Sequence, residues 1–414
     1  MSSQDLRSLD GTGAVAIIEP ASPLPSPDQI SAEPLSRRGF LHRLGLGAAT
    51  VFVVADGVVA YRAWDQGVLS EGDGPAFEAL EDWQSFQGPE AAVAAAVLAA
   101  SAHNAQPWAF AISGDRVDVF ADRTRTTGAN DALLREFHIS LGCALENLVL
   151  AAEANGYVTA VALDPGTSPD LVATVTLSAG TPMVSKLYEV IGRRRSNRSD
   201  FTDDPMPDTV MASMSLLSVA GADLVWLNDP TARAGFADLL VQATRAHVDD
   251  EEQSMDSFEW WRNDRDQIQD HKDGLNIDGV GLSPMVRTLG KILPGVDREA
   301  ADKTFLERTR SQADTAAAFG IVTVDDPYSL EQQLTGGRLL QRLHLWAAAN
   351  DLGFQHMNQI TERIDRDRQL GNTATFEQPL ADLAGAGTLA AFRVGTPTVD
   401  SMASPRRPVA EVLR

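Results

Sequence analysis

The sequence predicts an α+β protein in which two related halves share one chain, each with a central antiparallel sheet flanked by helices. Two repeated patterns predict this fold class. A helix ending with the same spacing of leucine, paired alanines and glycine occurs twice, as Leu148-x-x-Ala151-Ala152-x-x-x-Gly156 and as Leu345-x-x-Ala348-Ala349-x-x-x-Gly353. Each helix is followed by strand-like residues that run into Gly-Thr-Pro, at 180–182 and at 395–397. Because the matches come in the same order, they favour an internal duplication.

The repeated helices are the first elements to be expected in each half. One helix should run from near Leu133 to Gly156, and the other from near Leu330 to Gly353. Small residues along one face allow helices to approach closely, and a glycine after the last turn suits a left-handed C-cap. The strands that follow are expected at 171–177 and 389–394. With these elements, the first half spans residues 76–190 and the second spans residues 191–414.

Composition and charge describe a globular protein that is unsuited to polyanions. The 414 residues are 44% hydrophobic, which is ample for a core, and 57 acidic against 34 basic residues give a net charge of −23. This balance argues against nucleic acid or an anionic membrane surface as a partner. The single cysteine, Cys143, excludes an internal disulfide and a cysteine-cluster metal site, and its apolar surroundings predict a buried thiol. No metal site is expected.

The amino-terminal residues form a separate segment. Residues 1–35 are rich in Ser, Pro, Ala and Asp without periodicity, which predicts disorder. Within residues 36–65, Arg37-Arg38-Gly39-Phe40-Leu41 precedes an apolar run at 44–55 that is too short to span a bilayer. This pattern resembles a twin-arginine signal, which implies export, or tethering to the inner membrane, through the export machinery. The alternative is a basic turn before an ordinary helix in a cytoplasmic protein.

Residues 101–108, Ser-Ala-His-Asn-Ala-Gln-Pro-Trp, hold the densest group of candidate binding side chains. An alanine-rich helix is expected over 91–100, and Pro107 cannot continue it, so these residues form a loop at the helix exit. Polar groups on such a loop suit a flat ligand rich in amide groups. The candidate binding residues are Ser101, His103, Asn104 and Gln106. The histidine is expected to hold the loop rather than act as a base, and Trp108 is expected in the core.

Two arginine-rich stretches form the expected cationic part of a site. Residues 193–198 read Arg-Arg-Arg-Ser-Asn-Arg, and residues 404–408 read Ser-Pro-Arg-Arg-Pro near the carboxyl end. A solvated helix start and a solvated tail are the ordinary interpretations. The alternative is an oxyanion cradle, because guanidinium groups bind phosphate through paired hydrogen bonds and serine adds a hydroxyl donor. The candidates for this cradle are Arg194, Ser196, Arg198, Arg406 and Arg407.

Residues 247–294 have no counterpart in the first half. They combine charged runs with the adjacent Trp260 and Trp261, which are expected to cover an apolar surface. One interpretation is an excursion that closes over a ligand site as a lid. The other is a helical hairpin that caps the core.

Three motifs together resemble the nitroreductase superfamily. Residues 104–108 resemble the family's Asn-Thr-Gln-Pro-Trp element, and Arg194-x-Ser196-x-Arg198 resembles its Arg-x-Ser-x-Arg/Lys motif. The end of the chain, from 392 to 408, resembles the family's closing strand and basic tail. The resemblance covers roughly residues 80–414 and implies a nitroreductase-like fold that binds flavin mononucleotide (FMN). It implies that Arg194, Arg198 and Arg406, with Arg407, hold the phosphate, and that Asn104 and Gln106 hold the pyrimidine edge of the flavin.

The order of these motifs departs from the ordinary family pattern. Typical members carry the arginine motif first, and two chains form a dimer with flavin sites at the interface. Here the amide motif belongs to the first half and the arginine motif to the second, so the chain resembles the tandem branch in which one polypeptide imitates the dimer. This implies one FMN per chain, no need for an oligomer, and a lid formed by residues 247–294. Met357 and Asn358 lie where family members bring backbone near the flavin N5.

The resemblance implies two alternative functions. One is an FMN-dependent oxidoreductase that takes electrons from NAD(P)H or another donor and reduces nitroaromatic or quinone-like acceptors, with no catalytic side chain of its own. The other is a non-catalytic protein that sequesters flavin under a lid that blocks nicotinamide. Export would favour the second, because soluble NAD(P)H is not normally available outside the cell. A third and weaker alternative is a flavin-free interaction protein that kept only the fold.

Overall fold

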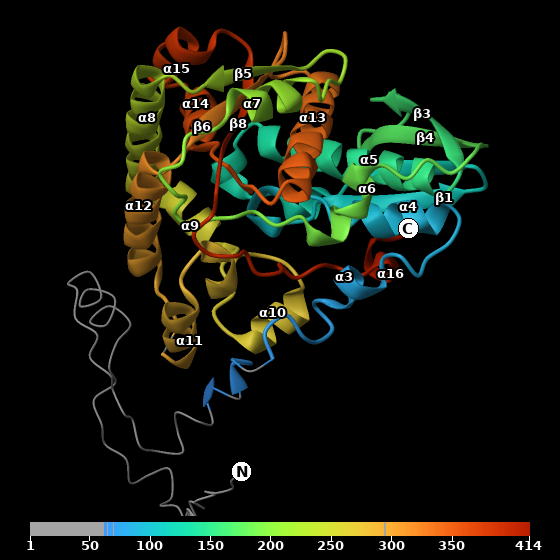
Figure 1. The fold of residues 1–414 in the computed structure, drawn as a ribbon, viewed down its shortest axis with the longest axis horizontal. Helices are drawn as coiled ribbons and strands as arrows, with labels where there is room; N and C mark the ends of the chain where they lie inside the picture. Colours follow the sequence, from blue (N-terminus) through green and yellow to red (C-terminus); the bar gives the residue numbers. More distant parts are fainter. Residues whose placement is uncertain (1–61, 64, 69, 294) are drawn as a thin grey trace, which may run out of the picture.

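The computed structural model describes residues 62–414 with the exception of 64, 69 and 294. Helices and antiparallel strands form this range, which confirms the predicted α+β class (Figure 1). The extension predicted at 1–35 lies outside the described residues, and so does the predicted signal segment up to residue 61. Among the helices that are described, none is long and apolar enough to cross a membrane.

The first sheet is built entirely from the first half. Its four strands are antiparallel and lie in the order β1-β2-β4-β3. β1 begins at Trp108, which is fully buried as predicted, and a two-residue turn joins it to β2. The bounds are Trp108–Ser113 for β1, Arg116–Ala121 for β2, Tyr157–Leu163 for β3 and Leu171–Ala179 for β4.

The second sheet repeats this arrangement in the second half. Its strands lie in the order β5-β6-β8-β7 and are again antiparallel, so both sheets place their strands in the order first, second, fourth, third. In both halves a 20-residue helix connects the second strand to the third. The bounds are Asp223–Leu227 for β5, Ala318–Thr323 for β6, Gly353–His356 for β7 and Thr388–Gly395 for β8.

The two long helices, α5 (Arg135–Ala154) and α13 (Leu330–Ala349), pack against each other between the sheets (Figure 1). Glycine allows their backbones to approach closely. A Cβ on Gly142 would lie 2.3 Å from the carbonyl oxygen of Leu334, and a Cβ on Gly337 would lie 2.3 Å from the carbonyl oxygen of Ile139. The two contacts mirror each other, as they do across a two-fold interface between identical subunits.

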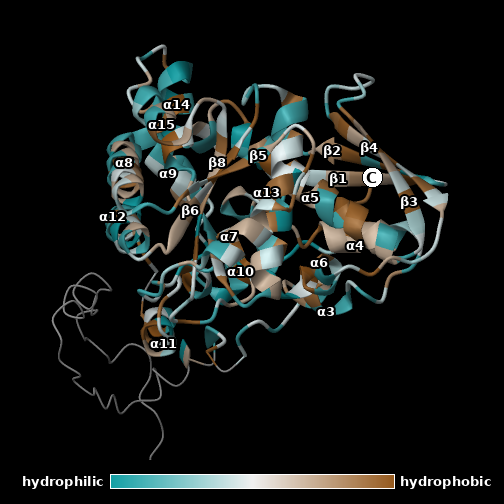
Figure 2. Ribbon diagram, turned by 45° about the horizontal axis from the view of Figure 1, so that its top comes forward, coloured by the Kyte–Doolittle hydropathy of each residue, from teal (hydrophilic) through white to brown (hydrophobic). Residues whose placement is uncertain are grey.

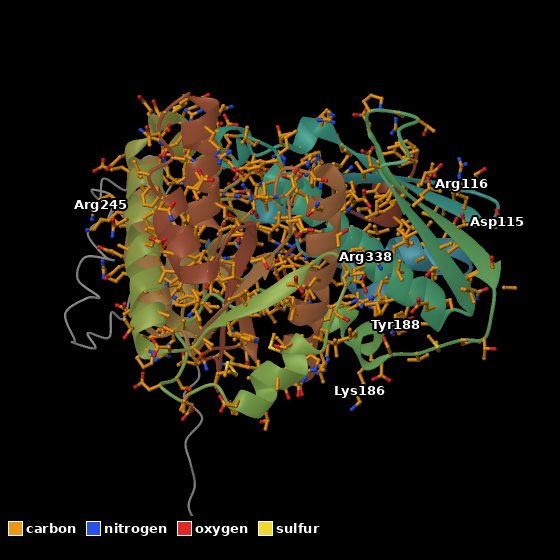
Figure 3. All side chains as sticks on the ribbon, turned by 90° about the horizontal axis from the view of Figure 1, so that it is seen from above. Asp115, Arg116, Lys186, Tyr188, Arg245 and Arg338 are labelled. Carbon is orange, nitrogen blue, oxygen red and sulfur yellow. The ribbon has the colours of Figure 1, made fainter. Side chains whose placement is uncertain are left out.

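Polar contacts fix the register of this helix pair. Glu146 of α5 is fully buried and accepts hydrogen bonds from Arg338 at 2.9 Å and Arg342 at 2.5 Å, both on α13 (Figure 3 labels Arg338). The thiol of Cys143 is also buried and donates to the carbonyl oxygen of Gly337 at 3.3 Å. Burial also raises the pKa of Cys143, and the predicted buried thiol is confirmed.

The predicted glycine caps differ between the two helices. Gly156 follows α5 with a φ of +87°, in the left-handed region that favours glycine. After α13 it is Asp351 that adopts a positive φ, of +55°, while Gly353 begins β7. The predicted left-handed cap at Gly353 is therefore wrong. Close packing explains this glycine, because a Cβ there would lie 2.5 Å from the ring of Phe201.

A long connection between β5 and β6 forms a helical layer on the outside of the second half (Figure 1). It includes all of the predicted insertion 247–294 and also the helices on either side of it. Figure 2 shows α8 and α12 largely hydrophilic on their outward faces, whereas α11 carries hydrophobic residues, drawn in brown, beside polar ones. The helices are α8 (Pro230–Asp249), α9 (Glu251–Glu259), α10 (Arg265–His271), α11 (Pro284–Ile292) and α12 (Arg298–Asp314).

Two segments cross from one half to the other. After β4 the chain passes into the second half, where the backbone N–H of Asn197 donates to the carbonyl of Phe354 at 2.8 Å. After β8 it returns to the first half, where Leu413 pairs with Phe110 of β1 (Figure 1, red). The arginine run and the basic tail therefore both lie at the junction. The remaining helices are α3 (Glu78–Asp82), α4 (Pro89–Ala96), α6 (Lys186–Glu189), α7 (Asp208–Ser215), α14 (Gln359–Gln369), α15 (Glu377–Ala384) and α16 (Val409–Val412).

Candidate functional site

A cavity of about 290 Å³ lies where the first half, the second half and the connection between β5 and β6 meet. The structure brings together at its wall five predicted site residues from three separate stretches of the sequence: Ser101, His103, Ser196, Arg198 and Asn358. The other six predicted site residues do not line it: Asn104, Gln106, Arg194, Met357, Arg406 and Arg407.

Four arginines form a cluster at this junction, here called the arginine cluster: Arg194, Arg195, Arg198 and Arg406. Arg194 and Arg406 are only 3% and 4% exposed. Within the described part of the chain, none of the four belongs to an ion pair. The predicted solvated helix start and solvated tail are therefore wrong at Arg194 and Arg406, although Arg193 is exposed. A buried group of like charges without a carboxylate is costly unless an anion joins it.

The pKa values of all four arginines in the cluster are lowered from their ordinary range. Burial, followed by the positive charge of Arg195, lowers the pKa of Arg194 to about 9. Burial lowers the pKa of Arg195 to about 10, and it also lowers the pKa of Arg198. The pKa of Arg406 lies well below its ordinary value because of burial and the charges of Arg194 and Arg195. The Nε atoms of Arg194 and Arg406 are also buried without a hydrogen-bond partner, which indicates a missing acceptor.

Contacts from both halves fix the backbone of the arginine run. The carbonyl oxygen of Arg198 accepts hydrogen bonds from Arg308 at 2.7 Å and Gln312 at 2.9 Å. The guanidinium of Arg194 donates to the carbonyl of Leu98, at 3.2 Å, in the turn that follows α4. The run is thus held in place without using all of its N–H donors.

The loop at 101–108 binds the basic tail through its two amide side chains. Asn104 donates to the carbonyl of Pro405 at 2.9 Å and accepts from the guanidinium of Arg406. Gln106 accepts from the backbone N–H of Arg407 at 2.9 Å and donates to the carbonyl of Lys272 at 2.8 Å. Their side chains are thus engaged with protein groups, outside the cavity wall. Asn104 orients an arginine of the cluster, and Gln106 joins the tail to the insertion.

Backbone strain marks the same loop. His103, Asn104 and Gln106 all adopt a positive φ, of 47°, 55° and 53°. Such conformations are unfavourable for residues other than glycine, and they persist where the surrounding contacts over-determine them. The hydroxyl of Ser101 contributes one of these contacts, since it accepts from the backbone N–H of Gln106 at 3.0 Å.

His103 contacts the insertion rather than acting alone. One ring nitrogen lies 3.0 Å from the hydroxyl of Ser257, at the end of α9. Burial, followed by the charge of Arg198, lowers the pKa of His103 to about 4, so the ring is neutral near pH 7. This is the geometry of a residue that holds the loop, as its position in the sequence predicts.

Met357 and Asn358 have different surroundings. Met357 is fully buried in the apolar core of the second half, and its backbone N–H donates to Ala391 at 2.8 Å. Asn358 lines the cavity and donates to the carboxyl of Glu136 at 2.8 Å. Asn358 therefore connects β8 to the first half, since its side-chain oxygen also accepts from the backbone N–H of Ala391.

An acidic part of the cavity wall was not predicted from the sequence. Glu136, at the start of α5, and Glu362, in α14, both line the cavity. Burial and the neighbouring charge of Asp131 raise the pKa of Glu136 to about 8, and burial raises the pKa of Glu362 well above its usual range. An acidic residue in the first turn of a helix is ordinary, so only its burial distinguishes Glu136.

The insertion covers the cavity with apolar side chains. Trp261 and Phe258 line it from α9 and the residue that follows its C-cap. Trp260 does not line the cavity, because it lies between the guanidinium groups of Arg125 and Arg262, each 5.6 Å from its ring. Asp273 forms ion pairs with both of these arginines and so joins the insertion to the first half.

The described residues contain no group of three or more His, Cys, Asp or Glu side chains arranged to hold a metal ion. The cavity and its surroundings combine the arginine cluster, an acidic wall and an apolar cover.

Comparison with curated proteins gives partial sequence matches. No family model matches the chain. Two curated proteins of Mycobacterium tuberculosis, named "Putative NAD(P)H nitroreductase Rv3131" and "Putative NAD(P)H nitroreductase MT3217", are each 28% identical to it over 168 residues. The match covers 40% of this chain and 48% of each relative, so the chain spans about half the length of the curated relatives it matches.

Solved structures give similarly distant matches. The FMN-dependent nitroreductase NfnB of Mycobacterium smegmatis, in complex with NADPH, matches with a TM-score of 0.31 and 12% identity over 55% of this chain and 97% of its own. A nitroreductase of Desulfitobacterium hafniense with bound FMN matches with a TM-score of 0.32 and 11% identity over the same shares of the two chains.

Proposed function

We propose that this chain is an FMN-binding oxidoreductase of the nitroreductase superfamily, with the arginine cluster as the site of the FMN phosphate. The observation that carries the proposal is the cluster itself. Arg194 and Arg406 are buried and Arg195 and Arg198 are half-buried in a protein of net charge −23, yet none of the four has a carboxylate partner among the described residues. A phosphate dianion would neutralise part of this charge and accept from the unpartnered N–H groups.

The residues present fit such a group. Arg198 belongs both to the cluster and to the cavity wall, so an anion on the cluster would be continuous with a ligand in the cavity. When bound, FMN would supply two-electron transfer at its ring system. The apolar side chains of the insertion would exclude water from the cavity, and Asn104 would hold Arg406 in place through the tail. The partial similarity to the curated mycobacterial relatives agrees with this assignment.

The test compares FMN with riboflavin, which lacks the phosphate. The full chain should bind FMN about a hundredfold more tightly, because two charge-assisted hydrogen bonds are worth about 3 kcal/mol. In Arg194→Ala and in Arg406→Ala this preference should fall about tenfold or more, measured by fluorescence quenching of the flavin. Arg245→Ala is the matched control, since Arg245 is exposed on the outside of α8 (Figure 3). Equal affinity for the two flavins in the unaltered protein would refute the proposal.

A second candidate function is flavin sequestration without turnover. The attachment of the insertion favours it, because Asp273 joins Arg125 of the first half to Arg262. A cover held in this way would keep NAD(P)H from a flavin in the cavity. If so, anaerobic addition of NADPH to the FMN-loaded protein leaves the flavin oxidised for minutes, whereas a reductase bleaches within seconds.

The variant Asp273→Asn separates the two candidates further. It leaves two partly buried arginines without their shared carboxylate, which should loosen the cover at a cost of about 3 kcal/mol. For a sequestering protein, both FMN release and bleaching by NADPH should become faster, as stopped-flow absorbance would report. The control is Asp170→Asn, which breaks the exposed pair with Arg123 and should change neither rate. Unchanged rates in both variants would exclude the sequestering function.

Origin and location belong to the same proposal. The two halves are proposed to descend from a duplication, which their common strand order and mirrored helix contacts support. The twin-arginine pattern at residues 36–65 supports export of the folded, flavin-loaded protein or its tethering to the inner membrane. Cell fractionation with detection of the mature amino terminus would test this, and cytoplasmic residence would favour the nicotinamide-dependent enzyme.

A further inference from the structure

Several buried polar side-chain atoms at the cavity wall have no hydrogen-bond partner among the described residues. The Oε1 atoms of Glu136 and Gln359 are buried and unpartnered, and so are both ring nitrogens of His247. These side chains come from α5, α14 and α8, and all of them line the cavity together with Glu362. Glu136, Gln359, His247 and Glu362 are here called the acceptor wall. The acceptor wall lines the same cavity that would hold the flavin, so the inference below rests in part on the proposed function, although no residue of the arginine cluster belongs to the acceptor wall.

The side chains of the acceptor wall are well buried. The exposed fraction is 7% for Glu136, 7% for Gln359 and 2% for His247. Buried polar atoms in native proteins are normally hydrogen-bonded, and an unmatched one costs about 1–3 kcal/mol. Several of them facing one cavity indicate a ligand group rather than a packing defect.

The arginines near the acceptor wall are already paired with other carboxylates. Arg135 forms two hydrogen bonds of 2.7 Å with Asp365, and Arg363 binds Asp250 and Asp367. The nearest titratable partner of Glu362 is His247, whose Nδ1 lies 3.9 Å from its carboxyl oxygen. Burial lowers the pKa of His247 to about 3, so this ring brings no positive charge near pH 7.

A group that donates hydrogen bonds and carries positive charge would fit these side chains once Glu136 and Glu362 are ionised. The amide oxygen of Gln359 can only accept, an ionised Glu136 or Glu362 can only accept, and a neutral His247 offers one acceptor. The ring of Phe305 packs edge-on against His247, with centroids 5.4 Å apart, and it also lines the cavity. Aromatic side chains beside carboxylates favour a flat organic cation over a hydrated metal ion.

We propose that the acceptor wall binds the cationic nitrogen group of a second ligand, an aromatic or heteroaromatic amidinium or ammonium compound. The charged group donates to Glu136, Glu362 and Gln359, and the aromatic part lies against Phe305 and the apolar cover. The cavity thus takes a cation at the acceptor wall, whereas the arginine cluster takes an anion. His103 lines the cavity together with Arg198 and His247.

Binding of such a cation should depend on pH. Glu136 faces Asp131 and Asn358, and Arg135 lies beside it on α5. Asp365 and Glu362 face it from α14. The pKa of Glu136, about 8, keeps its carboxyl group protonated at pH 6. The cation binds the ionised form of Glu136. For each carboxyl group that must lose a proton, the affinity for the cation should rise by up to about tenfold per pH unit. The affinity should therefore increase between pH 6 and pH 8.

The experiment is calorimetric titration of the full chain with benzamidinium chloride and with neutral benzamide, at pH 6 and pH 8. At pH 8, benzamidinium should bind at least about tenfold more tightly than benzamide. At pH 6 this preference for benzamidinium should be smaller. In Glu136→Gln and Glu362→Gln the advantage should fall to about twofold or less. Glu189→Gln, which alters an exposed carboxylate far along the sequence, is the matched control and should keep the full advantage.

Two controls keep the outcome decisive. Far-UV circular dichroism and the melting temperature establish that each variant is folded, and FMN affinity is measured separately. Loss of FMN binding with the cation preference intact would sink the flavin site alone. Equal binding of benzamide and benzamidinium, or a preference that survives in both folded glutamate variants, would overturn the acceptor wall.

Discussion

Glu136 stays protonated, and therefore uncharged, over a wider pH range in the folded chain than in the unfolded chain. Burial and the charge of Asp131 raise its pKa from 4.5 to about 8, and among the described residues only Asn358 donates a hydrogen bond to its carboxyl group. The unfolded chain releases the proton above pH 4.5, whereas the folded chain keeps it until about pH 8. Between these limits the folded state binds more protons, so this group makes the free energy of unfolding fall as pH rises, by up to about 1.4 kcal/mol per unit.

Glu136→Gln should therefore stabilise the protein in a pH-dependent way. The amide keeps the shape of the protonated acid and cannot ionise, so the melting temperature should rise by a few degrees at pH 8 and change little at pH 5. Thermal unfolding followed by circular dichroism measures both values. Glu189→Gln should leave the melting temperature unchanged at both pH values, since Glu189 is exposed. A variant that is less stable at pH 8 than at pH 5, relative to the unaltered chain, would contradict this account.

At the residue scale, the position of a side chain can be predicted from the sequence where its residue type has few possible roles. The sequence predicts Trp108 and Cys143 in the core, because a large indole and a lone thiol seldom have another place. The resemblance implies that Asn104 and Gln106 hold the pyrimidine edge of the flavin, and in the structure their amides bind the tail about 300 residues later. A side-chain amide looks the same in the sequence whether its partner is a ligand or a distant carbonyl, so only the fold separates the two roles.

At the scale of elements, the close crossing of α5 and α13 connects the two halves. Gly142 and Gly337 each face a carbonyl oxygen of the opposite helix. A methyl group cannot be accommodated there without moving one helix, because the atom in the way is backbone. The spacing of small residues predicted helices that pack closely, but it could not identify which glycines form the crossing.

Gly142→Ala should therefore destabilise the protein even though alanine is the better helix former. We expect a loss of about 1–3 kcal/mol in the free energy of unfolding, measured by urea denaturation. The matched control is Gly235→Ala in α8, where a Cβ would make only an ordinary contact of 3.4 Å with Leu383. That variant should gain about 0.5–1 kcal/mol from helix propensity. If both substitutions stabilise, the helices are not held as closely as described.

At the scale of the whole molecule, the repeat could be predicted and its asymmetry could not. Gly-Thr-Pro after matched helices indicated two halves, and both sheets indeed have the same strand order. The helical connection from α8 to α12 replaces a two-residue turn in the first half, and its cover over the cavity depends on contacts such as Asp273 with Arg125. Such contacts join segments distant in the sequence and leave no local pattern. The acceptor wall could not be predicted from the sequence for the same reason, because its side chains come from separate helices.

The asymmetry of the halves leads to a prediction of stoichiometry. The amide loop before β1 fixes Arg406, whereas the residues before β5, 216–222, contain no asparagine, glutamine or histidine that could fix a tail. The arginine cluster draws on residues 194–198 and the tail, and neither motif has a second copy. A two-fold related flavin site would therefore lack both its anion cradle and the loop that positions it.

We accordingly expect one FMN per chain at saturation. The measurement is flavin absorbance after denaturation, divided by the protein amount from quantitative amino-acid analysis, on samples loaded with excess FMN and then dialysed. The double variant Arg194→Ala/Arg406→Ala should retain none, because the removed guanidinium groups would hold the only phosphate site proposed for the described residues. A ratio near two would mean that the first half keeps a site of its own, built from residues other than a copy of the arginine cluster. In that case the motifs would describe one of two pockets, and the chain would imitate the symmetric dimer in binding as well as in topology.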